Sequence, residues 1–397
     1  MKRIYLDHAA TTPLSDEAFA AMSPYFSQVF GNANSQHSFG RDAAKAVNEA
    51  RQTVAECIGA KPNEIYFTSG GTESDNWAVK GIAMRLASKG KRIITTQIEH
   101  PAIYSSCKQL EKAGFEVVYL PVDEEGFVHE EELEAALTSD TVLVSIMFAN
   151  NEIGTIQPIK RLAELAHRQG VLFHTDAVQA TGALHINVKE LGVDMLSLSG
   201  HKFYGPKGIG ALYIRNGMQT EPFMTGGEQE RTKRGGTTNV PAIVGMAAAL
   251  KAACRDMDKD NAYVAALRDK FVRRVLDEIP EVLFNGAKDM RFRLPNNANF
   301  SFKCIEGESV LFSLDLDGIC ASSGSACSSG SLEPSRTLLA IGVPVGTAHG
   351  SIRFTFGKAN TEEDVDYAVD RLVAVVERLR RMSPLWGKSD CAIKTVK

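Results

Sequence analysis

Short apolar runs alternate with helical patterns through the middle of this 397-residue chain. Runs of this kind are typical of strands buried on both faces, and the segments between them space their apolar residues as a helix does. The alternation predicts a mostly parallel sheet with helices on both faces, because parallel neighbours need a long crossover between them. We expect strands at 64–68, 91–96, 116–120, 141–147, 171–175, 195–199 and 208–214, and helices from Glu73, from Pro101 and over 130–137 and 159–169.

The chain changes character after Cys254, where a charged stretch precedes a helix that ends at Glu278. A further strand, a Ser/Gly-rich loop and a last amphipathic helix follow, and we expect Asn360 and Glu363 to cap that helix. The change places a domain boundary near residue 255. The prediction is a large domain over residues 15–255 and a smaller α/β domain that combines residues 1–14 with 256–397.

The composition excludes several classes of protein. Lys and Arg total 44 against 48 Asp and Glu, a net charge of −4, and 44% of the residues are hydrophobic. A chain of this kind is neither disordered nor a polybasic nucleic-acid binder, and we expect no direct nucleic-acid binding. The longest apolar run, 242–250, is too short for a membrane span, and residues 1–6 are too short for a signal-peptide core. We expect no membrane association and a cytoplasmic location.

Polar residues gather where the expected strands end, which is where open α/β sheets bind ligands. The first strand is followed by Ser69-Gly70-Gly71-Thr72-Glu73, which opens a helix. Glycines admit close approach of a ligand to the backbone, and a helix N-terminus favours phosphate. The alternative is a plain strand–helix turn. His100 follows the second strand, and a histidine there could equally be structural.

Three further strand ends add the remaining groups. Asn151 follows one strand, Asp176 and then Gln179 follow another, and Lys202 follows a third. Asp176 could simply cap the next helix, but a lysine at the end of a buried strand is costly unless it is paired or used. Pyridoxal phosphate needs an amine, an acid against its ring nitrogen, a flat group over the ring and donors for its phosphate. Together these residues favour that cofactor.

Three motifs carry a resemblance to a known family. They are Tyr5-Leu6-Asp7-His8-Ala9-Ala10-Thr11-Thr12, Ser199-Gly200-His201-Lys202 with Gly205-Pro206-Lys207-Gly208, and Ser322-Ser323-Gly324-Ser325-Ala326-Cys327. The sequence resembles the cysteine desulfurases of the NifS/IscS type, which are class V members of the fold-type I, aspartate-aminotransferase-like pyridoxal-phosphate enzymes. The resemblance runs from Tyr5 to Phe354. It implies that fold, and a homodimer.

The resemblance also implies roles for single residues. Lys202 would form the Schiff base with the cofactor, Asp176 would pair with the pyridinium nitrogen and Gln179 with the phenolic oxygen. His100 would stack on the ring and assist proton transfer. Phosphate binding falls to Gly71, Thr72, Ser199 and His201, completed by Thr237 of the neighbouring subunit, and the substrate carboxylate falls to Asn151, also a cofactor contact, and Arg353.

Cys327 is the expected second nucleophile. Residues 321–330 hold no bulky side chain, so they predict a mobile loop with an exposed, ionisable cysteine. Its thiolate would take the sulfur of L-cysteine as a persulfide, release alanine and pass the sulfur to an iron–sulfur scaffold protein or a tRNA-thiolation enzyme. Cys327 could also be a transient iron–sulfur ligand. Cys320 could resolve the persulfide, or be a buried small residue.

Other activities stay open from the sequence. Within the same class, the alternatives are a selenocysteine lyase and an aminotransferase, although an aminotransferase has no use for Cys327. From a different class, the alternative is a non-catalytic iron–sulfur scaffold. The set of Lys202, Asp176 and His100 argues against a purely non-catalytic role.

Overall fold

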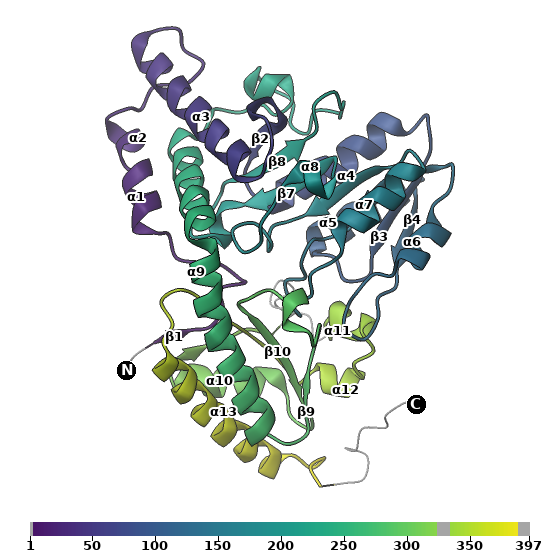
Figure 1. Cartoon of the computed structure of the whole chain (residues 1–397), viewed down its shortest axis with the longest axis vertical. Helices are drawn as coiled ribbons and strands as arrows, with labels where there is room; N and C mark the ends of the chain where they lie inside the picture. Colours follow the sequence, from purple (N-terminus) through teal and green to yellow (C-terminus); the bar gives the residue numbers. More distant parts are fainter. Residues whose placement is uncertain (1–2, 324–333, 388–397) are drawn as a thin grey trace.

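The computed structural model describes residues 3–323 and 334–387, and a seven-stranded sheet dominates its larger part (Figure 1). The strand order is β2-β8-β7-β6-β5-β3-β4. The predicted ends of each of these strands lie within two residues of the observed ends. Their bounds are β2 Ile65–Thr68, β3 Arg92–Thr96, β4 Glu116–Leu120, β5 Thr141–Ser145, β6 Leu172–Asp176, β7 Met195–Ser199 and β8 Gly210–Ile214.

One strand departs from the parallel pattern. β8 runs antiparallel to both of its neighbours, β2 and β7, whereas the other pairs are parallel. β7 ends at Ser199 and β8 begins at Gly210. A connection this short returns as a hairpin-like link, because a parallel crossover needs a dozen or more residues. The short link is what makes the sheet mixed.

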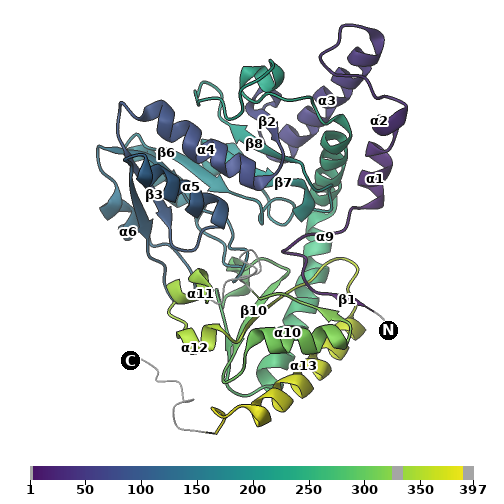
Figure 2. The same cartoon turned by 180° about the vertical axis from the view of Figure 1, so that it is seen from behind.

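Helices cover both faces of the sheet (Figures 1 and 2). One face packs in a single apolar core with α3, α6, α7, α8 and the first half of α9, and the other packs with α4 and α5 around the fully buried Trp77. The bounds are α1 Asp16–Met22, α2 Pro24–Ser27, α3 Ser38–Cys57, α4 Gly71–Leu86, α5 Pro101–Lys112, α6 Glu130–Ala136, α7 Ile159–Arg168, α8 Val188–Leu191 and α9 Val240–Glu278.

A three-stranded and a two-stranded sheet share a second core. In the first, β10 pairs antiparallel with β9 and β12; in the second, β1 pairs parallel with β11. Helices α10, α13 and the second half of α9 join this core around Phe271, which contacts three other buried phenylalanines. The bounds are β1 Ile4–Tyr5, β9 Val282–Phe284, β10 Asn297–Phe302, α10 Gly307–Leu316, β11 Ile319–Cys320, α11 Arg336–Ala340, α12 Val345–Ala348, β12 Ser351–Thr355 and α13 Glu362–Met382.

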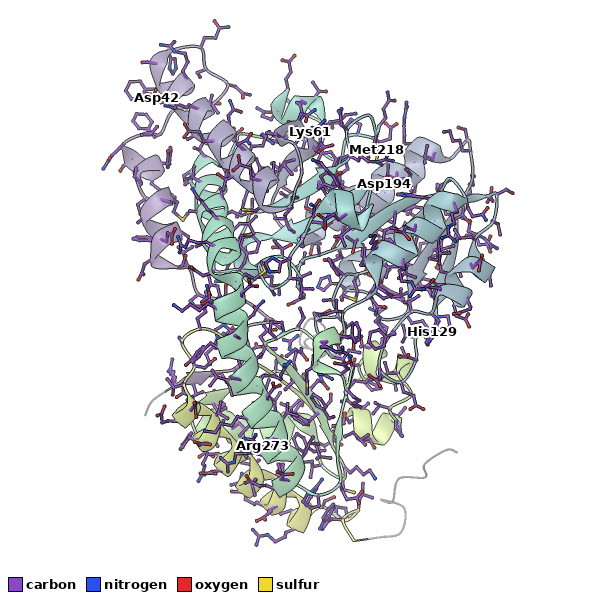
Figure 3. The ribbon with its side chains drawn as sticks, in the orientation of Figure 1. Asp42, Lys61, His129, Asp194, Met218 and Arg273 are labelled. Carbon is purple, nitrogen blue, oxygen red and sulfur yellow. The ribbon has the colours of Figure 1, made fainter. Side chains whose placement is uncertain are left out.

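Helix α9 joins the two parts, and it begins at Val240 rather than after the charged stretch that follows Cys254. The helix runs without interruption for 39 residues; it contributes residues up to Ala253 to the first core and from Val264 to the second. Asp42 in α3 and Arg273 in α9 lie toward opposite ends of the molecule (Figure 3). The charged residues between the cores lie on a helix that spans the gap. The division near residue 255 stays a prediction. No helix within 3–323 or 334–387 has the length and apolarity to cross a membrane.

The cap of α13 lies one residue later than predicted. Thr361 Oγ1 accepts from the Asp364 amide at 3.2 Å, and Asp364 Oδ2 accepts from the Thr361 amide at 3.1 Å. Asn360 instead accepts from Gly357 N and donates to the Tyr5 carbonyl, 2.8 and 3.1 Å away. Sequence spacing permits both capping pairs, and the tertiary bond to the N-terminal strand assigns Asn360 elsewhere.

Candidate active site

A cavity of about 270 Å³ lies at the carboxyl ends of the central strands. Parallel strands end at the same edge of a sheet, so residues far apart in sequence meet there. Thr237, exposed just before α9, does not line it, and Cys327 lies outside the described residues. The predicted residues that do line the cavity are Gly71, Thr72, His100, Asn151, Asp176, Gln179, Ser199, His201, Lys202 and Arg353.

One end of the cavity is built to hold an anion. Helix α4 starts at Gly71, and no side chain caps its first turn. Gly71 must be glycine, because a Cβ there would approach the side chain of Val178 to 2.5 Å. The bare backbone N–H groups of Gly71 and Thr72 therefore meet the cavity, beside Ser199 at the end of β7. A free helix N-terminus of this kind suits a phosphate.

Asp176 and His100 form an electrostatic pair. Asp176 ends β6, and its Oδ1 accepts from Val178 N at 2.9 Å. Burial raises its pKa, while His100 and Lys202 pull the pKa down. Burial lowers the pKa of His100. His100 Nδ1 accepts from Ala102 N at 3.1 Å, so the neutral ring carries its proton on Nε2.

The amine of Lys202 is held by the N-terminal segment. Lys202 ends the short 3₁₀ helix that follows β7, and its Nζ donates to the carbonyls of Ala9 and Ala10, the second at 2.9 Å. Gln179 Nε2 also donates to the Ala9 carbonyl, at 3.0 Å. The segment around Ala9 therefore fixes the lysine and the glutamine together at the base of the cavity.

Arg353 supplies a guanidinium from β12 of the three-stranded sheet. The residue is 4% exposed; Nη1 donates to the Asn151 carbonyl at 2.8 Å and Nη2 to Asp7 Oδ1 at 2.9 Å. Nε is buried and has no hydrogen-bond partner among the described residues. Because a buried donor without a partner is costly, this N–H is suited to bind an anionic group that enters the cavity.

The residues present fit pyridoxal phosphate. An amine, a buried carboxylate, a flat imidazole and a free helix N-terminus line one cavity. The uncapped start of α4, which only glycine can occupy, matches the phosphate, and Asp176 matches the ring nitrogen. A spare arginine donor then remains for the carboxylate of an amino-acid substrate.

Three acidic residues at the site were missed from the sequence. Asp75 lines the cavity, and burial together with the charge of Asp176 raises its pKa well above the usual range. It lies four residues after Gly71, so helical spacing could have placed it on the same face. Asp7 and Glu152 act through long-range contacts, with Arg353 and with Ser335, that no local pattern signals.

Glu99 gives the site a testable pH dependence. Burial raises its pKa to about 8, although Met147 N and Thr96 Oγ1 donate to Oε1. Between its ordinary pKa and about pH 8 the native protein holds a proton that the unfolded chain releases, so its free energy of unfolding falls as pH rises. Glu99→Gln should raise the melting temperature more at pH 8 than at pH 5, by roughly 3 °C. A difference that does not vary with pH would contradict a protonated Glu99.

The structure describes one of the two cysteines with an expected role. Cys320 lies in β11 and is partly exposed, so it is not a fully buried small residue; its partial burial raises the pKa of its thiol. Iron–sulfur ligation by Cys327 falls outside the described residues. Within the described ranges, no group of three His, Cys, Asp or Glu side chains could hold a metal ion.

Comparisons with known proteins agree with this geometry. The family description "Aminotransferase class-V" matches residues 4–368. The chain is 55% identical to "Cysteine desulfurase IscS" of Dictyoglomus turgidum, over 97% of both chains. Among solved structures it is similar to a "NIFS-LIKE PROTEIN" (38% identity, TM-score 0.90, 95% of this chain and 100% of that one). It is also similar to "SspA in complex with cysteine" (34% identity, TM-score 0.80, 91% and 100%).

Proposed function

The chain belongs to the cysteine desulfurases within the class-V aminotransferase family, and we propose from its cavity how its own residues take sulfur from L-cysteine. The observation that carries the assignment of roles is the meeting of Lys202, Asp176, His100 and Arg353 in one cavity. The selenocysteine lyase and aminotransferase alternatives have no observation in their favour, and a non-catalytic scaffold would not need this set.

The cofactor and the lysine supply the first half of the reaction. Pyridoxal phosphate, when bound, withdraws electrons from the substrate's α-carbon and so makes the α-proton acidic. Lys202 Nζ, held by the Ala9 and Ala10 carbonyls, is the base for that proton. Asp176 would pair with the ring nitrogen of the cofactor. His100, neutral with its proton on Nε2, is a donor that can protonate a leaving group.

Arg353 and Asn151 orient the substrate. The spare Nε–H of Arg353 and its two bound Nη groups form a fork of fixed direction. A carboxylate on this fork would be held in the same cavity as Lys202, which limits the orientations that the substrate can take. Binding of this kind requires an α-carboxylate on the substrate.

Cys327 completes the reaction as the sulfur acceptor. Its thiolate attacks the substrate's sulfur, an S–S bond forms and the C–S bond breaks. The electrons of the C–S bond pass to the carbon skeleton, which gains protons and leaves as alanine. We call residues 324–333 the Cys327 segment. The contact that supports this role lies just before it in the sequence, where Ser322 pairs with Arg353 through two backbone hydrogen bonds of 3.2 and 2.7 Å.

The stoichiometry of alanine release tests this scheme. Without a reductant or acceptor protein, each site should release about one alanine and then stop, because the persulfide blocks the nucleophile. Dithiothreitol should restore continuous release. Rapid-quench sampling with amino-acid analysis measures both, at known cofactor content. Continuous turnover without reductant would contradict a persulfide on the enzyme.

We propose that the active enzyme is a homodimer. Glu73 accepts from Arg234 Nε at 2.8 Å and from Ser69 N at 2.8 Å, so the segment before Thr237 is fixed to the phosphate loop. Thr237 itself is exposed and away from its own cavity. A second copy would bring Thr237 of the partner subunit to the phosphate. Exposed aromatic side chains on and near α1–α3 offer apolar surface for such contact: Phe19, Phe26, Phe30 and Phe39.

The protein that accepts the sulfur and the cellular compartment complete the proposal. A persulfide is passed by thiol exchange to another protein, and an iron–sulfur scaffold protein or a tRNA-thiolation enzyme are the acceptors that we propose. The name of the Dictyoglomus relative supports the first of these. We also propose a cytoplasmic location.

A further inference from the structure

Glu152 lies beside the cavity in a position that the reaction as described does not use. It follows Asn151, and its backbone is fixed on both sides. Its N–H donates to Asn150 Oδ1 at 2.8 Å, and its carbonyl accepts from the side chains of Asn297 and Asn299 at 3.1 and 3.2 Å. Three residues therefore hydrogen-bond to the backbone of Glu152, and two more hydrogen-bond to its side chain.

The carboxylate of Glu152 binds the start of α11. Its Oε2 accepts from Ser335 Oγ at 2.5 Å, and its Oε1 accepts from Thr337 Oγ1 at 3.4 Å. Ser335 is also the N-cap of α11, because its Oγ accepts from Leu338 N at 3.2 Å. Both hydroxyl residues are buried. A carboxylate that accepts from hydroxyls forms a charge-assisted bond, stronger than a neutral one.

The other attachment of the Cys327 segment meets the same point. Ser322 pairs with the backbone of Arg353, and Arg353 Nη1 donates to the Asn151 carbonyl at 2.8 Å. Residues 322 and 335 therefore flank residues 324–333 and are both fixed to the dipeptide 151–152, one through Arg353 and one through Glu152. The side chain that is expected to take the substrate carboxylate belongs to this connection.

We propose that Glu152 is a positioning residue for sulfur transfer: its contacts with Ser335 and Thr337 fix the C-terminal attachment of the Cys327 segment to the substrate-binding pair Asn151 and Arg353. The inference rests on the proposed function of Cys327. A geometry error of about 1 Å at a reacting atom lowers a rate by roughly a hundredfold. An anchor placed two residues beyond the segment thus affects the rate of sulfur transfer more than the affinity for the substrate.

The test compares Glu152→Gln with a matched control. Glu64→Gln is suitable, because Glu64 is also buried and accepts from two backbone amides, Lys61 N and Asn216 N. Glu64 directly precedes β2 and does not line the cavity. The holoenzyme variants are compared for alanine burst rate at saturating L-cysteine and for cysteine affinity from the change in cofactor absorbance. We expect Glu152→Gln to lower the burst rate about tenfold with affinity within about twofold, and Glu64→Gln to change neither.

A double variant and a chemical probe complete the design. The double variant Glu152→Gln with Ser335→Ala should lower the burst rate no further than the stronger of the two single changes. Both changes disrupt the same contact between Glu152 and Ser335, so their effects should not add. Iodoacetamide should alkylate Cys327 several-fold faster in Glu152→Gln than in Glu64→Gln, followed by peptide mass spectrometry in the resting enzyme. An unchanged burst rate with an unchanged alkylation rate would overturn the proposal, as would equal losses of rate and affinity. Alkylation does not depend on turnover. If Cys327→Ala still makes alanine while Glu152→Gln changes the alkylation rate of Cys327, the proposed function of Cys327 is refuted. The positioning role of Glu152 is then retained.

Discussion

Cys327→Ala should lower alanine release from L-cysteine by at least about a thousandfold, while pyridoxal phosphate still binds. The reason is that the described residues lining the cavity include Lys202, His100 and Arg353, the proposed base, proton donor and carboxylate-binding residue, but no cysteine. Those groups can activate the α-carbon, yet none of them can accept a sulfur atom. The measurement is alanine per site over time with excess reductant, at equal absorbance of the bound cofactor.

Cys320→Ala is the matched control for this experiment. Cys320 lies in β11, seven residues before Cys327, and is the preceding cysteine in the sequence. We expect this variant to keep its alanine burst, because its thiol is partly buried and its pKa is raised. If Cys327→Ala releases alanine as fast as the unmodified enzyme, sulfur leaves by direct elimination. If Cys320→Ala alone loses activity, the wrong cysteine has been assigned.

The strand and helix pattern could be predicted because it depends on local periodicity. The ends of β3 and β7 agree with the prediction to within one residue, since an apolar run bounded by polar residues marks a strand buried on both faces. The direction of β8 was not predicted, because direction depends on the length of a link rather than on any run. The start of α9 at Val240 could not be predicted, because the charged residues of its middle lie between the two cores and carry no apolar periodicity that marks a helix.

The cavity residues could be predicted for a different reason. In an open α/β sheet the strand ends share one edge, so a residue such as Asp176 or Lys202 can be placed by its position after a strand. Residues that enter from elsewhere have no such rule. Asp7 reaches Arg353 across 346 positions of sequence, and Glu152 reaches Ser335 across 183. Their partners lie in the smaller part of the fold, and only the tertiary structure brings them to the cavity.

Lys202→Ala should lower both alanine release and α-proton exchange by at least about a thousandfold. Lys202 Nζ is held at the base of the cavity by the carbonyls of Ala9 and Ala10, and its charge is among the groups that act on Asp176 and His100. The change therefore removes the proposed base and also alters the electrostatics of the cavity. Transfer of deuterium from α-deuterated L-cysteine to water measures the proton step without depending on Cys327.

Lys207→Ala is the control for Lys202, because Lys207 is exposed in the same glycine-rich motif and lies outside the cavity lining. It should keep α-deuterium exchange and alanine release. Loss of exchange in Lys202→Ala but not in Cys327→Ala would separate the two halves of the reaction, with proton removal at Lys202 and sulfur transfer at Cys327. Exchange that persists in Lys202→Ala would show that another group, such as His100, removes the α-proton. Because Nδ1 of His100 accepts from Ala102 N and Nε2 carries the proton of the neutral ring, that outcome would require Nδ1 to give up this hydrogen bond.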